Sequence, residues 1–162
     1  MVAILEMMHK LSIHSKTPCT IPENFRHVKI DPNWDGTFSL SADLPYRMVS
    51  LPAIEITFAI GGTWNGGSVP WLVSWLVPKF GEYDWPFFVH DLGYGSKTRS
   101  RKEWDVELLA LCKIVDLELL SRMGRFRRLY MGSVYLSRRR AIYRAVRMFG
   151  GRFFAEPISY NV

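Results

Sequence analysis

The spacing of hydrophobic residues separates a β-rich first part of the chain from a helical second part. Apolar and polar residues alternate clearly over residues 54–60 and weakly over residues 38–42, which predicts two strands. Turn signals built from Asn, Asp, Gly and Pro lie at residues 33–36 and 43–45. Residues 1–30 show no clear period and are compatible with either an arm or an edge strand.

Three longer segments repeat their apolar residues at helical spacing. We expect helices over residues 85–94, 100–122 and 126–148. Ser100 and Glu103 have the spacing of a capping box at the start of the second helix. Glycines follow each helix and are expected to end it, at 93 and 95, at 124 and at 150–151. The apolar face of the second helix comprises Trp104, Leu108, Leu111 and Val115.

A glycine-rich segment lies between the strands and the helices. Four of the residues 61–67 are glycine, which predicts a loop rather than the interior of a strand or helix. Pro70 suits the first turn of a short apolar helix over residues 70–77.

These elements predict an α+β fold in a single domain. A small N-terminal β portion is followed by the glycine-rich loop and a bundle of three or four helices. Short connections make successive helices antiparallel neighbours. We divide the chain into an N-terminal arm with strands (1–45), a main unit (46–150) and a C-terminal tail (151–162).

Composition supports a folded chain. Of its 162 residues 48% are hydrophobic and 14% aromatic, enough for a sizeable core, which excludes a disordered chain or a coiled coil. Two cysteines, Cys19 and Cys112, make no disulfide framework, and Cys112 is expected to be a buried hydrophobe. No apolar run approaches the roughly 20 residues that span a bilayer, and residues 1–10 lack the pattern of a signal peptide. We expect the protein to fold in a cytoplasm.

Positive charge is concentrated near the C-terminal end. The formal net charge is +6, and residues 122–152 hold ten arginines, no lysine and no acidic residue. Such a block is compatible with a polyanionic partner, which would be nucleic acid, anionic lipid or an acidic protein face, or equally with a solvated helix face. The candidate anion-binding residues are Arg138, Arg139, Arg140, Arg144 and Arg147.

His90 is the strongest candidate for chemistry. It lies with Asp91 in an otherwise apolar run, where both side chains need partners to offset the cost of burial. Tyr94 shares its helix face, and Asp91 points about a third of a turn away. Asp105 lies at the border of the next helix's apolar face and could reach His90 across a helical hairpin. It would then orient the imidazole as a general base, or else the pair would only pin two helices together.

The glycine loop offers a second half of a site. Its backbone oxygens and one aspartate carboxylate suit the beginning of a Ca²⁺ shell. The loop lacks the ending of a phosphate-binding loop and the spacing of a dinucleotide fingerprint, and Ser68 lacks the flanking residues of a nucleophile elbow. The candidate metal ligands are Asp91, Gly61, Gly62, Asn65, Gly66 and Gly67.

Four motifs in order resemble the phage and prophage domain-of-unknown-function family 1353. They are Asn-Gly-Gly-Ser-Val-Pro at 65–70, His-Asp-x-x-Tyr at 90–94, the Arg101 to Asp105 segment, and Tyr-Arg-Ala-Val-Arg-Met-Phe-Gly at 143–150. The chain departs from that family at Asn65, where Asp is common, and at Gly93, where Leu is usual. The resemblance implies a phage origin, synthesis in the host bacterial cytoplasm, and no particular activity.

The His-Asp-x-x-Tyr helix also resembles that of secreted phospholipases A2. In those enzymes a glycine-rich calcium loop precedes this motif, and an Asp on an antiparallel helix orients the His. The resemblance implies that His90 activates water, that Asp91 and loop carbonyls hold Ca²⁺, and that Tyr94 and Asp105 brace His90. The disulfides and the usual loop pattern of those enzymes are missing.

Two main hypotheses follow. The first is a phage-encoded, Ca²⁺-dependent ester hydrolase of the phospholipase A2 type that sits on anionic lipid. The second is a non-enzymatic virion protein, such as a tail, neck or ejected component, whose arginines bind another subunit or nucleic acid. A factor that blocks a host defence is a third option.

Overall fold

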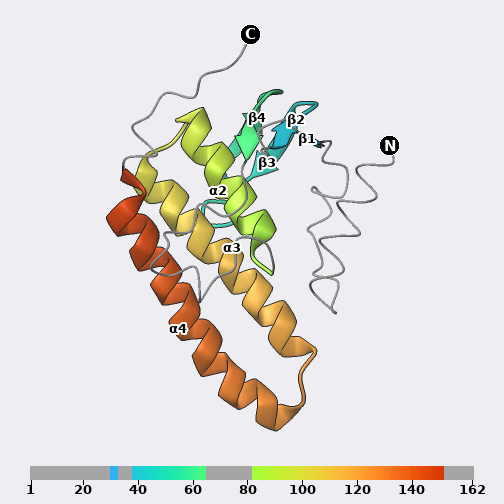
Figure 1. Cartoon of the computed structure of the whole chain (residues 1–162), viewed down its shortest axis with the longest axis vertical. Coiled ribbons are helices and arrows are strands. Elements are labelled where there is room, and N and C mark those ends of the chain that lie inside the picture. The colour runs from blue at the N-terminus through green and yellow to red at the C-terminus, as the bar shows by residue number, and fades with distance from the viewer. Residues whose placement is uncertain (1–29, 33–37, 65–81, 152–162) are drawn as a thin grey trace.

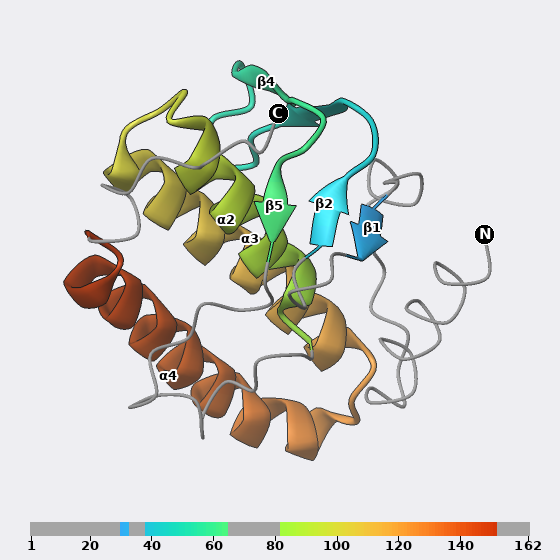
Figure 2. The ribbon, with the colours of Figure 1, turned by 45° about the horizontal axis from the view of Figure 1, so that its top comes forward.

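The strands form two small antiparallel sheets. The computed structural model describes residues 30–32, 38–64 and 82–151. Within them, β1 (Ile30–Pro32), β2 (Phe38–Leu40) and β5 (Thr63–Trp64) form one sheet in the order β1-β2-β5. The second sheet is the hairpin of β3 (Leu44–Arg47) and β4 (Glu55–Phe58). Figure 2 shows β1, β2 and β5 side by side, next to α2.

The β3–β4 hairpin follows a strict alternation. Leu44 pairs with Phe58 and Tyr46 with Ile56, and all four are buried, whereas their neighbours along both strands are exposed. The clear alternation over residues 54–60 is thus confirmed as a strand. The turn expected at residues 43–45 is wrong for its second half, because β3 begins at Leu44 and includes Pro45. A proline is tolerated there because a two-stranded sheet has only edge strands.

The start of the glycine-rich segment is a turn followed by a strand. Gly61 has φ +84°, in the left-handed region that favours glycine. The next residues pair with β2, so β5 lies inside the segment that was expected to be all loop. The remainder of that segment and the helix expected over residues 70–77 lie outside the described residues.

Three helices follow in the described residues: α2 (Asp84–Ser96), α3 (Arg101–Ser121) and α4 (Arg125–Phe149). Helix α3 lies between α2 and α4 and packs against both (Figure 1). The predicted capping box is present, since Ser100 accepts from the Glu103 amide and Glu103 reaches back to the Ser100 amide. None of these helices has a stretch that is long and apolar enough to cross a membrane.

Helix α2 runs further than expected. Glycines at 93 and 95 were predicted to break it, yet it continues to Ser96 and ends at Lys97 in the left-handed conformation, φ 50°. The reason is tertiary: a Cβ on Gly93 would lie 2.3 Å from the ring of Trp104. Gly93 therefore serves the close approach of α2 to α3, and packing outweighs its weak helix propensity.

A single core joins the sheets to the helices. The four residues that the sequence placed on the apolar face of α3 are buried, and so is Cys112. Phe58 of β4 packs on Trp104 of α3 with ring centroids 5.7 Å apart. Leu40 and Leu44, from the N-terminal portion, belong to the same cluster. The α+β class is confirmed.

Candidate active site

His90 and Asp105 meet at the interface of α2 and α3. The His90 side chain is 5% exposed and that of Asp105 is fully buried. The Nε2 atom of His90 lies 3.0 Å from Oδ1 of Asp105, which is hydrogen-bond distance. The approach that the two helices were expected to bring about is therefore present.

Asp105 is surrounded by hydrogen-bond donors. The Tyr94 hydroxyl donates to the same Oδ1 that faces His90, and the Tyr94 and His90 rings lie 4.0 Å apart between centroids. Arg147 of α4 donates from Nη1 to Oδ2 at 2.8 Å. Arg101, one turn before Asp105 on α3, has its Nε 3.8 Å from the same Oδ2. Three helices thus converge on one carboxylate.

The end of α4 is fastened to this group. Arg101 donates from Nη2 to the carbonyls of Val146 and Arg147, at 2.7 and 2.5 Å, which satisfies two of the last carbonyls of the helix. Gly150 follows the helix, and a Cβ there would lie 2.9 Å from the Tyr94 hydroxyl. Gly150 therefore leaves the room that Tyr94 needs to reach Asp105.

These contacts set the protonation states. Burial would raise the pKa of Asp105, but the hydrogen bonds from His90, Tyr94 and Arg147 outweigh it and lower that pKa. Burial would lower the pKa of His90, but the contacts with Asp105 and Asp91 outweigh it and raise that pKa. Burial and the bond to Asp105 raise the pKa of the Tyr94 hydroxyl, which keeps it a donor.

The tautomer of neutral His90 follows from these states. An ionised Asp105 only accepts, so Nε2 carries the proton and Nδ1 keeps its lone pair. That Nδ1 lies 3.8 Å from Oδ1 of Asp91, too far for a direct hydrogen bond. Asp91 is 16% exposed against 5% for His90, so Asp91 is the more accessible residue of the pair.

Comparisons with family models, with curated proteins and with solved structures find no match for this chain. The resemblances to the phage family and to secreted phospholipases A2 remain predictions from the motifs quoted above.

The described part of the proposed calcium loop supplies few free ligands. Gly62 packs against Leu92, the neighbour of Asp91, and its carbonyl accepts from the Leu40 amide at 2.9 Å. The described residues contain no group of three or more His, Cys, Asp or Glu side chains able to hold a metal. Asp91 and a partly used turn do not fit a Ca²⁺ shell by themselves. The other ligands, Asn65, Gly66 and Gly67, lie outside the described residues.

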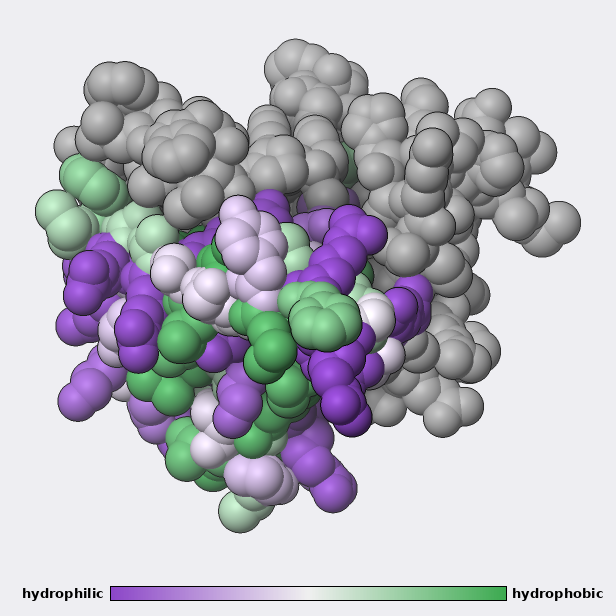
Figure 3. Space-filling model, turned by 90° about the horizontal axis from the view of Figure 1, so that it is seen from below, coloured by the Kyte–Doolittle hydropathy of each residue, from purple (hydrophilic) through white to green (hydrophobic). Residues whose placement is uncertain are grey.

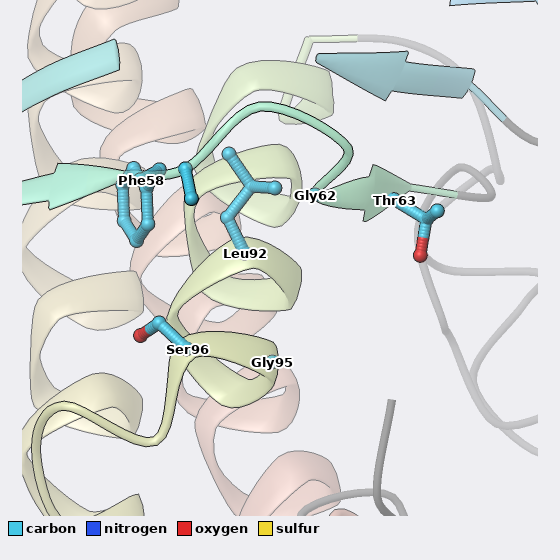
Figure 4. Close-up of a pocket in the computed structure, with 7 residues that line it drawn as sticks. Phe58, Gly62, Thr63, Leu92, Gly95 and Ser96 are labelled. Atoms are coloured by element: carbon cyan, nitrogen blue, oxygen red, sulfur yellow. The ribbon is translucent and has the colours of Figure 1, made fainter. Parts of the chain in front are cut away.

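A small pocket lies beside this turn. It is formed where the β4–β5 turn meets the last part of α2, with Gly62, Leu92, Gly95 and Ser96 in its wall (Figure 4). Gly95 is one helical turn after Asp91, but neither Asp91 nor His90 lines the pocket.

A second carboxylate cluster on α3 repeats the pattern without a histidine. Asp116 is nearly fully buried and accepts from the Tyr83 hydroxyl, which precedes α2, and from Nη1 of Arg139 on α4, both at 2.5 Å. Tyr83 and Asp116 lie 11 residues from Tyr94 and Asp105, respectively, so one bridge joins α3 and α4 to α2 and the other joins them to the residue just before α2. Asp116 was not among the predicted site residues, although it lies next to the apolar position Val115 as Asp105 lies next to Trp104.

A third buried carboxylate joins α3 to the β3–β4 hairpin. Glu107 accepts from the Tyr46 hydroxyl and from the amides of Val49 and Ser50, at 2.6 and 2.8 Å for the two amides. Glu107 was not among the predicted site residues either. Its donors are all local to the hairpin, so its role is structural.

The five candidate anion-binding arginines separate into two groups. Arg147 binds Asp105, Arg139 binds Asp116, and Arg138 binds Glu82 at 2.8 Å. Arg140 and Arg144 are exposed, and neither forms an ion pair within the described residues. Part of the arginine block thus holds the helices together.

Proposed function

We propose that this chain is a phage-encoded ester hydrolase of the phospholipase A2 type, with His90 as the general base. The observation that carries the proposal is the contact of His90 Nε2 with Asp105 Oδ1 at 3.0 Å, made by a carboxylate that Tyr94 and Arg147 already hold in place. A base oriented by a second residue is what activation of water requires.

The internal comparison with Asp116 supports a role for His90 beyond packing. At Asp116 a tyrosine and an arginine suffice to join the three elements. Asp105 has the same two partners and an additional histidine. Because the helices can be joined without an imidazole, the presence of His90 at only one of the two bridges favours a chemical use for it.

The reaction would proceed in two proton transfers. Nδ1 of His90 takes a proton from water as the water oxygen bonds to the ester carbonyl carbon, and Asp105 stabilises the imidazolium that forms. The carbon–oxygen bond to the leaving alcohol then breaks, and His90 returns its proton to that oxygen. Asp105 stays ionised throughout, because its donors lower its pKa.

The substrate we favour is a lipid ester on an anionic surface, in keeping with the resemblance to phospholipases A2. Calcium would polarise the ester carbonyl when bound. Its site would need Asn65, Gly66 and Gly67 in addition to Asp91, and no step above depends on it.

The test is fatty-acid release from phosphatidylglycerol vesicles by the full chain, with Ca²⁺ or with EDTA. His90→Gln should lower the rate by a factor of about 10²–10⁴, the usual contribution of a general base. Asp116→Asn is the matched control, since it breaks the equivalent bridge and should leave the rate per folded molecule unchanged. Release by His90→Gln at the wild-type rate would contradict the proposal.

The pH profile adds a second test. Contacts with Asp105 and Asp91 raise the pKa of His90, so its basic form accumulates only above its ordinary range and the rate should rise with pH there. Asp105→Asn removes one of these contacts, so the pH range over which the rate rises should move to lower pH. The maximum rate should also fall, because the imidazolium is no longer stabilised. If wild type releases no fatty acid in either buffer and the chain is found in purified phage particles, the virion-protein hypothesis takes its place.

A further inference from the structure

The side of α4 that faces away from α3 carries large exposed apolar residues near both ends of the helix. Tyr135, Ile142, Ala145 and Val146 are buried and mark the inner side of the helix. On the opposite side Phe126 is 87% exposed, Leu129 74%, Tyr130 70% and Met148 73%. A surface helix ordinarily carries polar residues there, so these four side chains call for an explanation.

The same side is positively charged. With 100° of turn per residue, the four apolar residues fall within about 100° of arc on the helix, and Arg140, Arg144 and Arg147 fall in the same arc, although Arg147 is bonded to Asp105. Helix α4 contains no acidic residue. We call this set the outer α4 face: Phe126, Leu129, Tyr130, Arg140, Arg144 and Met148.

We propose that the outer α4 face docks on an anionic lipid surface, with the helix lying in the plane of the headgroups. Large apolar side chains would enter the boundary between headgroups and acyl chains, and the arginines would contact lipid phosphates. Figure 3 looks onto the end of the molecule where α3 and α4 are joined, and it shows hydrophobic and hydrophilic side chains interleaved there.

The charge of the face selects among possible partners. A second copy stacked through the same face would bring arginines against arginines, with no carboxylate on either helix to compensate. Nucleic acid would use the arginines, but it offers no apolar environment for Phe126, Leu129 and Met148. An anionic bilayer satisfies both kinds of side chain.

Docking of the outer α4 face on lipid is compatible with the proposed active site but does not depend on it. Arg147 lies on α4 one turn after Tyr143 and binds Asp105, so the C-terminal half of the docked helix is the part that contacts the His90 cluster. Binding to lipid requires no turnover. The two proposals can therefore fail separately.

The experiment is co-sedimentation of the full chain with vesicles of phosphatidylglycerol and phosphatidylethanolamine, against vesicles of phosphatidylcholine. The double variant Phe126→Ser with Leu129→Ser should bind anionic vesicles with an association constant lower by about tenfold or more, because two large apolar side chains no longer enter the lipid. Arg140→Gln with Arg144→Gln should abolish the preference for anionic vesicles while weak binding to phosphatidylcholine remains.

The matched control removes exposed apolar side chains from elsewhere. Ile60, 59% exposed after β4, and Leu117, 56% exposed on α3, are changed to serine. This variant should bind like wild type. Unfolding midpoints show whether all variants are folded, and hydrolysis of a water-soluble ester shows whether the active site is intact.

Two results would overturn the proposal. One is equal binding of the Phe126/Leu129 variant and wild type to anionic vesicles. The other is binding to a DNA duplex, or self-association in sedimentation velocity, that depends on the outer α4 face while vesicle binding is absent.

Discussion

Replacing Gly93 with alanine would place a methyl group against the ring of Trp104. The Cβ would lie 2.3, 2.4 and 2.6 Å from three ring carbons, Cδ2, Cε3 and Cε2. Ordinary carbon–carbon contacts are about 3.5–4.0 Å, so α2 and α3 must separate or the indole must move by about 1 Å. Trp104 is fully buried, which leaves it little room to move.

The expected loss of stability combines two opposed terms. Overpacking a well-filled core costs roughly 1–3 kcal/mol, and a rigid ring at such short range places this site near the upper end. Alanine in place of glycine in a helix interior returns about 1 kcal/mol. We therefore expect Gly93→Ala to lower the free energy of unfolding by about 2 kcal/mol, or the melting temperature by roughly 4–8 °C.

Gly132 provides the matched control for this variant. It lies within α4, and a Cβ there would meet nothing within 4 Å, so Gly132→Ala gains helix propensity without a clash. It should stabilise the chain by about 0.5–1 kcal/mol. Urea unfolding of both variants separates the two terms. If Gly93→Ala is as stable as Gly132→Ala, the close approach of the helices is not what selects glycine at position 93.

Three further predictions concern the charged groups of the helices. Glu107→Gln turns one acceptor of a buried carboxylate into a donor that faces the hairpin amides, and urea unfolding should show a loss of about 1–3 kcal/mol. The folded state lowers the pKa of Asp105, so this carboxylate contributes to the free energy of unfolding above the ordinary carboxyl range. That contribution is lost as the pH falls through the folded pKa, so wild type should lose more stability than Asp105→Asn below about pH 4. Arg128 donates to the carbonyls of Leu120, Ser121 and Met123 at the end of α3, so Arg128→Ala should cost about 0.5–1 kcal/mol in the same assay. Arg127→Ala is the control for Arg128→Ala, and an equal loss of stability in both variants would refute the capping role of Arg128.

The elements that the sequence predicted well are those whose signal is local. The alternation over residues 54–60 and the period of the long helices depend only on which face is buried, and β4, α3 and α4 follow them closely. The elements that were missed depend on partners far along the chain. Strand β5 exists because β2 offers it a free edge, and α2 passes through Gly93 because Trp104 occupies the space of a side chain.

The candidate site divides in the same way. His90, Tyr94 and Asp105 were found because helical spacing places the first two on one face and a carboxylate at the border of an apolar face needs a partner. The contributions of Arg101 and Arg147 were missed, although Arg101 precedes Asp105 by one turn. Arg147 contacts Asp105 across 42 residues, a pairing that no local pattern encodes.

The two Tyr–Asp–Arg bridges show how one block of arginines can serve two purposes. A carboxylate buried on α3 needs cations from a neighbouring helix, and α4 provides one arginine to Asp105 and another to Asp116. Both arginines bond to carboxylates of α3, so their charges are used within the fold. The exposed aromatic and aliphatic side chains on the outer α4 face stabilise nothing in the described fold, and together with Arg140 and Arg144 they match a surface that carries both negative charge and hydrocarbon.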